Sequence, residues 1–151
     1  MTVNTMQNIT QQTLKNYRHI QAEIEAFDAV AQDCRQRIAQ LIEADKLYQQ
    51  AAEHFTSEPA EAAEHAETVR QTVTAYRAME QRAAENALHL VQMKARVEDF
   101  MLSIPDADLR RAFALRYLKG MTWQEVAAAI GGNTTEDSIR QQVHRYMKKA
   151  E

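Results

Sequence analysis

Glycine, proline and cysteine are scarce in this chain of 151 residues, which holds 3 Gly, 2 Pro and 1 Cys. Together with an aromatic share of 7%, this leaves little material for strands and hairpin turns. The single Cys34 excludes an internal disulfide and a multi-cysteine zinc site, which fits a reducing cytoplasm. No run of 18 apolar residues is present, so we expect no membrane span. The first residues lack the basic patch and apolar core of a secretion signal.

Enzymatic signatures are also missing. The chain has no Gly-x-x-x-x-Gly-Lys-Ser/Thr phosphate loop and no His-Glu-x-x-His zinc motif, and its five histidines are scattered. The adjacent Gly131 and Gly132 lack the preceding strand and the following Lys that a phosphate loop requires. We therefore expect a protein that is not an enzyme, with no catalytic residue, no metal site and no cofactor.

Good helix formers dominate the remaining composition, and 45% of the residues are hydrophobic, so the sequence predicts an all-α protein. Apolar residues recur at alternating steps of three and four, the pattern of a long helix packed on another. Asp45 is the one polar position of this first seam. Its members are Tyr17, Ile20, Ile24, Phe27, Ala31, Cys34, Ile38, Leu41, Asp45, Tyr48, Ala52 and Phe55.

A second helix is expected to begin at Pro59, with Ser57 or Glu58 as its N-cap, because proline suits a first helical turn. Its weaker, alanine-rich seam consists of Ala62, Ala66, Val69, Val73, Tyr76, Glu80, Ala83, Ala87, Leu90, Lys94, Val97, Met101 and Ile104.

Residues 1–103 are thus predicted to form a long antiparallel helical hairpin with a coiled-coil-like seam. Because two helices alone enclose a thin core, we expect the hairpin to pair with another copy, as a homodimer or higher homo-oligomer. His54 and His65 flank the predicted tip among several glutamates, in a spacing that matches no zinc pattern. This favours a solvated, acidic tip.

Residues 104–151 are predicted to form a small three-helix unit. Ser103 and Asp106 have the spacing of a capping box around Pro105, and Gly120 is a natural helix stop. Thr122 and Glu125 form a second capping box, which opens a short helix that Gly131 closes. Thr134 or Thr135 caps a third helix, which runs to about Lys149. Two short helices joined by a glycine-containing turn are typical of a helix-turn-helix DNA-binding domain.

Charge is distributed unevenly between these two parts. Residues 1–103 carry 10 Lys and Arg against 15 Asp and Glu, whereas residues 104–151 carry 8 against 6. The stretch from Ser138 to Ala150 is basic and contains no acid. Arg and Gln side chains suit guanine and adenine edges, and basic residues towards the helix end would lie near phosphates. The candidate DNA-binding residues are Thr135, Glu136, Ser138, Arg140, Gln141, His144, Arg145, Lys148 and Lys149.

The run RYLKGMTWQEVAAAIG resembles the C-terminal promoter-binding domain, region four, of primary sigma factors. Ile139-Arg140-Gln141 matches the Ile-Arg-Gln of the sigma recognition helix, and the resemblance implies contacts to −35-type bases by Arg140 and Gln141. It covers about the last third of the chain. Seven residues separate Gly131 from Ile139, about two more than in the sigma pattern, so we expect the third helix to be set at its own angle.

Over its full length the layout resembles the RinA/ArpU-type regulators of late genes found in phages and prophages of Gram-positive bacteria. The segments that carry this resemblance are LKNYRHIQAEIEAF, IPDADLRRAFALRYLKGMTWQEVA and DSIRQQVHRYM. It implies a bacterial cytoplasmic protein, associated with the nucleoid when bound, that acts with the host RNA polymerase. It also implies Trp123 as a core anchor and Arg140, Arg145 and Lys148 as DNA contacts.

The leading hypothesis is therefore a phage-type transcription regulator that binds specific double-stranded DNA. One alternative is a DNA-packaging protein of small-terminase type, although in those proteins the DNA-binding part usually comes first. Another is a helical protein–protein adaptor without DNA-binding activity.

Overall fold

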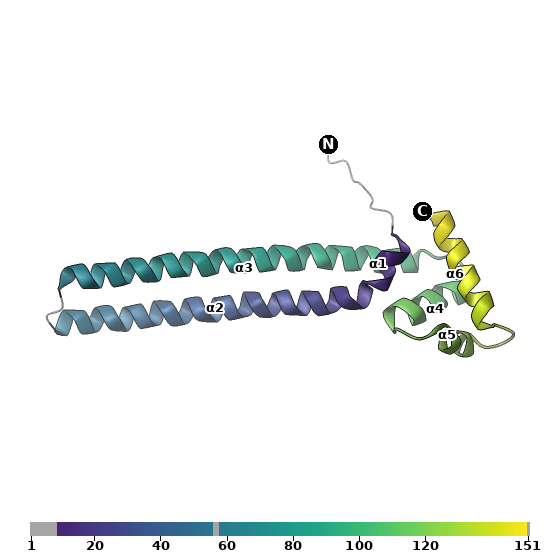
Figure 1. Ribbon diagram of the computed structural model, residues 1–151, viewed down its shortest axis with the longest axis horizontal. Helices are drawn as coiled ribbons and strands as arrows, with labels where there is room; N and C mark the ends of the chain where they lie inside the picture. The colour runs from purple at the N-terminus through teal and green to yellow at the C-terminus, as the bar shows by residue number, and fades with distance from the viewer. Residues whose placement is uncertain (1–8, 56–57, 151) are drawn as a thin grey trace, which may run out of the picture. The chain divides into compact units, whose positions relative to one another are not determined.

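The computed structural model describes residues 9–55 and 58–150, and the regular elements among them are all helical (Figure 1). The predicted all-α class is confirmed. The described residues form two compact units, one of residues 23–89 and one of residues 9–22 with 90–150. In chain order the helices are α1 (Gln11–Lys15), α2 (Tyr17–His54), α3 (Pro59–Leu102), α4 (Ala107–Phe113), the π-helical segment η1 (Ala114–Leu118), α5 (Trp123–Ile130) and α6 (Glu136–Ala150).

The long helices α2 and α3 lie side by side and antiparallel, which confirms the predicted hairpin (Figure 1). Almost every position of the two predicted seams is buried or half-buried. The exception is Phe55, which is 76% exposed, so the seam of α2 ends at Ala52. None of the helices in the described part of the chain combines the length and the apolar character that a membrane span needs. Buried seam residues include Ala31, Cys34, Val73, Ala83 and Ala87.

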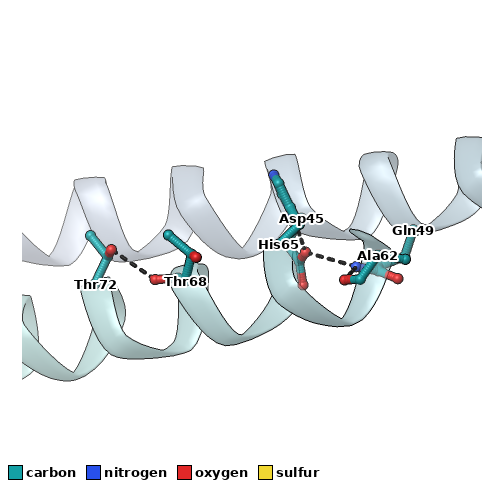
Figure 2. Close-up of polar contacts among 6 residues, drawn as sticks. All are labelled: Asp45, Gln49, Ala62, His65, Thr68 and Thr72. Carbon is teal, nitrogen blue, oxygen red and sulfur yellow. Dashed lines mark hydrogen bonds and ion pairs between the residues drawn. The ribbon is translucent and has the colours of Figure 1, made fainter. Parts of the chain in front are cut away.

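The one polar residue in the seam of α2 has a specific partner on α3. Nδ1 of His65 lies 3.0 Å from Oδ1 of Asp45 (Figure 2). The His65 ring also stacks on Tyr48, with 3.9 Å between centroids. Gln49 donates to Asp45 and also to the backbone oxygen of Ala62 (Figure 2). The glutamates of the predicted solvated tip are exposed, whereas His65 is half-buried and pairs with Asp45 in the seam.

Helix α3 begins at Pro59, as predicted, and the amide of Glu61 donates to the backbone oxygen of Glu58. Glu58 therefore stands at the N-cap position. The alternative cap, Ser57, lies outside the described residues.

The C-terminal unit has one apolar core, to which the start of the chain also contributes. Phe113, Val126 and Val143 are fully buried there, and so is Leu14 of α1. Tyr17 at the start of α2 donates to Glu98 near the end of α3, at 2.7 Å. Burial and the Glu98 carboxylate raise the pKa of Tyr17 to about 12, so the hydroxyl stays a donor. The compact unit thus crosses the boundary after residue 103 that the sequence predicts.

Helix caps decide where the short helices begin. The predicted start at Ser103 was wrong: Oγ of Ser103 donates to the backbone oxygen of Phe100 at the end of α3. Asp106 is the N-cap of α4 and accepts from the amide of Leu109. The Thr122–Glu125 capping box of α5 is confirmed, because both of its reciprocal hydrogen bonds are present.

Candidate nucleic-acid interface

Helix α6 is amphipathic, and its buried face determines which side chains it presents outward. Ile139, Val143 and Met147 lie at steps of four and are at most 3% exposed. They belong to the core that also contains Phe113 of α4 and Val126 of α5. This burial, predicted from the sequence, holds α6 against the other two helices of the unit.

The opposite face of α6 carries Gln141, Arg145 and Lys148. These residues follow at steps of four and three, so they lie along one side of the helix. All three are exposed. No ion pair joins Arg145 or Lys148 to a carboxylate anywhere in residues 9–55 and 58–150. Their charges are therefore available to an anionic partner.

The turn before α6 depends on two glycines. Gly131 and Gly132 have φ values of 79° and 63°, in the left-handed region that side chains rarely adopt. The amide of Gly131 donates to the backbone oxygen of Ala127 and closes α5. A Cβ at either glycine would meet no atom within 4 Å, so the requirement for glycine is conformational and not steric.

Thr135 and Ser138 form a reciprocal cap at the start of α6. The amide of Ser138 donates to Oγ1 of Thr135, and the amide of Thr135 donates to Oγ of Ser138, both at 3.1 Å. Of the two caps that the sequence allowed, Thr135 is thus the observed one. The same two hydroxyls were predicted to contact DNA, and in this structure both are engaged in capping.

Acidic residues occupy the first turn of α6 next to the cap. Glu136 is exposed there, and Asp137 accepts from Nη2 of Arg140 at 2.6 Å. This ion pair involves a residue predicted to contact a base, and the sequence reasoning did not anticipate it. The i, i+3 spacing of the two residues was the available signal.

His144 contacts a residue from the other end of the chain. Its Nδ1 lies 3.5 Å from Nε2 of Gln11 in α1, at the outer limit of a hydrogen bond. Gln11 is thus the neighbour of the polar face of α6 that sequence reasoning missed. Lys149, the last predicted contact, is exposed in the final turn of α6.

Trp123 anchors α5 through a cation–π contact with Arg116 and an aromatic contact with Tyr117. The guanidinium of Arg116 lies over its ring, 4.9 Å from the centroid, and donates to the backbone oxygen of Met121. The ring also meets Tyr117 edge to face, with 6.5 Å between centroids. Trp123 is half-buried at the edge of the core, and it ties η1 to α5.

Comparison with known proteins gives no relative for this arrangement: no family model, no curated protein and no solved structure matches the chain.

Proposed function

We propose that the protein binds double-stranded DNA by placing the outer face of α6 in the major groove. The observation that supports this most directly is the exposed face of Gln141, Arg145 and Lys148 opposite a fully buried one. A helix of this kind, held at its base by a core and preceded by a tight turn, is the recognition element of helix-turn-helix proteins. Arginine and glutamine side chains can each make paired hydrogen bonds to a base edge.

The position of Arg140 gives it a second role in this proposal. Arg140 directly precedes Gln141 in α6. The side chain of its partner Asp137 is 76% exposed. An exposed ion pair of this kind is weak, so a base or phosphate can replace the carboxylate. We assign base contacts to Arg140 and Gln141, and phosphate contacts to Lys148 and Lys149.

The hairpin is proposed to join two copies of the chain. Its core is a single seam between two helices, whereas several large apolar side chains remain outside it. Val30 and Met79 are 41% and 50% exposed and line one shallow hollow with Phe27 and Ala83. A second hairpin packed there would remove this apolar surface from water. A dimer would then present two copies of α6 to two half-sites.

Taken with the resemblance to RinA/ArpU-type regulators, these features support a transcription regulator of late phage genes that acts with the host RNA polymerase. The chain offers a DNA-binding unit and a hairpin for assembly, which are the two parts that such a role needs.

The test begins with selection of bound fragments from random duplexes, followed by titration of the selected sequence in a gel-shift assay. The double variant Arg140→Ala/Gln141→Ala should lose discrimination against substituted sites, by about 1–3 kcal/mol for each paired base contact. The control is Arg77→Ala/Gln92→Ala, which removes the same side chains from exposed positions of α3. Equal affinity and specificity of wild type and the α6 variant would rule out base contacts by these residues.

Solution mass distinguishes the assembly states. A dimer supports the regulator, a ring of eight or more copies supports a packaging protein, and failure to retain any duplex at low salt supports a protein–protein adaptor.

A further inference from the structure

Basic side chains from two distant parts of the sequence line a hollow in the C-terminal unit. Its volume is about 520 Å³, within the range of roughly 300–1,000 Å³ found for small-molecule sites. None of the residues that line it was predicted as a site residue. We call it the basic cleft, and its lining residues are Lys15, Arg18, His19, Arg116, Tyr117 and Gly120.

The charge of the basic cleft is one-sided. Lys15, Arg18 and Arg116 are cationic, and no carboxylate belongs to the lining. Within residues 9–55 and 58–150, no ion pair neutralises any of these three side chains. Cations held together without a counter-charge repel one another. A bound anion would be attracted to all three side chains and would offset that repulsion.

Glycine at position 120 makes room for one of these cations. The Arg18 guanidinium occupies the space that a Cβ on Gly120 would need. Gly120 also has a φ of 73°, which other residues rarely adopt. The close approach places the guanidinium against the backbone at the end of η1, and π-helical turns of this kind are frequent at functional sites.

A buried tyrosine also belongs to the lining of the basic cleft. Tyr117 is 5% exposed, and its hydroxyl oxygen makes no hydrogen bond among the described residues. Burial raises the pKa of this hydroxyl, and the Gln11 side chain and the Arg116 charge partly offset the rise. A buried hydroxyl without a hydrogen-bond partner is costly, so a ligand oxygen that accepted a hydrogen bond from it would be stabilising.

We propose that the basic cleft binds a phosphate group. Phosphate combines nearly two negative charges with several acceptor oxygens, which suits guanidinium and ammonium donors together with a hydroxyl. The phosphate can belong to the DNA backbone, since Gln11 lies beside both Tyr117 and His144 of α6. It can equally belong to a free phosphorylated small molecule, which the volume of the cleft would admit.

The first experiment uses the full chain without DNA, so it does not depend on the proposed DNA-binding function. Inorganic phosphate and pyrophosphate are titrated at an ionic strength of about 0.15 M, which screens non-specific attraction. Amide chemical shifts report the binding. We expect saturable shifts around η1, and a loss of affinity of about tenfold or more in Arg18→Ala, the scale of one charge-assisted hydrogen bond. The matched control is Arg77→Ala, an exposed arginine of the hairpin.

Tyr117→Phe is the second variant, because it removes only the hydroxyl and keeps the buried ring. It should weaken pyrophosphate binding while circular dichroism stays unchanged and the unfolding temperature of the unbound chain stays at or above that of wild type. Absence of saturable binding, or equal binding by wild type and both cleft variants, would overturn the proposal.

Duplex DNA distinguishes the two sources of the phosphate. Displacement of bound pyrophosphate by excess duplex assigns the cleft to the DNA backbone. Simultaneous binding of both assigns it to a free phosphorylated ligand. A chain that binds pyrophosphate but no duplex would refute the proposed DNA-binding function and leave the phosphate site established.

Discussion

Arg140 and Asp137 form an ion pair across one turn of α6, with 2.6 Å between Nη2 of the arginine and Oδ1 of the aspartate. The aspartate stands in the first helical turn, where a carboxylate also interacts favourably with the helix dipole. In the unbound protein, an arginine expected to contact a base is therefore held by a neighbouring acid. Asp137 and the exposed Glu136 thus place negative charge beside the basic side chains of α6.

Replacing Asp137 by asparagine should strengthen binding to all DNA duplexes. The substitution removes a charge that repels phosphates and frees the Arg140 guanidinium, so we expect a severalfold gain in affinity at low salt, diminishing as salt rises. Fluorescence anisotropy with a labelled duplex measures this gain. The control is Asp33→Asn, which breaks the ion pair with Arg37 on the hairpin. A weaker or unchanged affinity of the Asp137 variant would contradict the proposed orientation of α6.

Truncating Leu14 should destabilise the C-terminal unit, although Leu14 lies near the other end of the sequence. Its side chain is fully buried in that core, and a buried Leu→Ala substitution costs about 2–5 kcal/mol. Urea unfolding followed by the fluorescence of Trp123, the single tryptophan, reports on this unit. Leu47→Ala on the hairpin is the control, since Leu47 is 57% exposed. Equal unfolding midpoints for the two variants would show that α1 does not stabilise this core.

The capping box of α5 should contribute measurably to stability. Thr122→Ala removes the acceptor of the Glu125 amide, and loss of such an N-cap costs about 1 kcal/mol. The same fluorescence signal follows the change, because Trp123 is the first residue of α5. Thr74→Ala is the control: it replaces an exposed mid-helix threonine and should be neutral or slightly stabilising. An unchanged midpoint for Thr122→Ala would argue against the cap.

The hairpin should lose stability in acid through Asp45. Hydrogen bonds from Gln49 and then His65 hold the pKa of Asp45 below its usual value, which is about 3.9 in an unfolded chain. The unfolded state therefore binds the proton more tightly, so this contribution is complete above pH ~4 and disappears as pH falls through the lower, folded pKa. Asp45→Asn should be less stable than wild type at neutral pH, and the difference should shrink towards pH ~3.

Thermal unfolding followed by circular dichroism at several pH values measures that difference. Asp28→Asn serves as the control, because Asp28 is exposed on the same helix and forms no ion pair within the described residues. A stability difference between wild type and Asp45→Asn that is constant from neutral pH to pH ~3 would contradict the role of this carboxylate.

The sequence predicted those features that depend on local periodicity and on local hydrogen bonds. The seams of the hairpin could be predicted because buried positions of a long helix recur every three or four residues. The Thr122–Glu125 cap could be predicted because both partners lie within one turn. The buried face of α6 followed from the spacing of Ile139, Val143 and Met147.

Contacts between distant segments could not be predicted in this way, because no periodicity links residues that meet only in the folded chain. Leu14 lies before the predicted seam of the hairpin, and it completes the core of the C-terminal unit. Asp45 is the one polar position of its seam, and its partner His65 comes from α3, twenty residues further along the chain. For the proposed DNA-binding residues, sequence determined which side chains α6 carries, and the structure decided which of them are engaged in caps and ion pairs.

The chain's composition and periodicity thus determine an all-helical protein with a long hairpin and a capped, amphipathic final helix, since these depend on backbone propensity and the burial of apolar stripes. Only the tertiary structure brings Lys15 and Arg18 beside Arg116, Tyr117 and Gly120. These residues lie about a hundred positions apart in the sequence, and packing of the start of the chain against the C-terminal helices is what makes them neighbours.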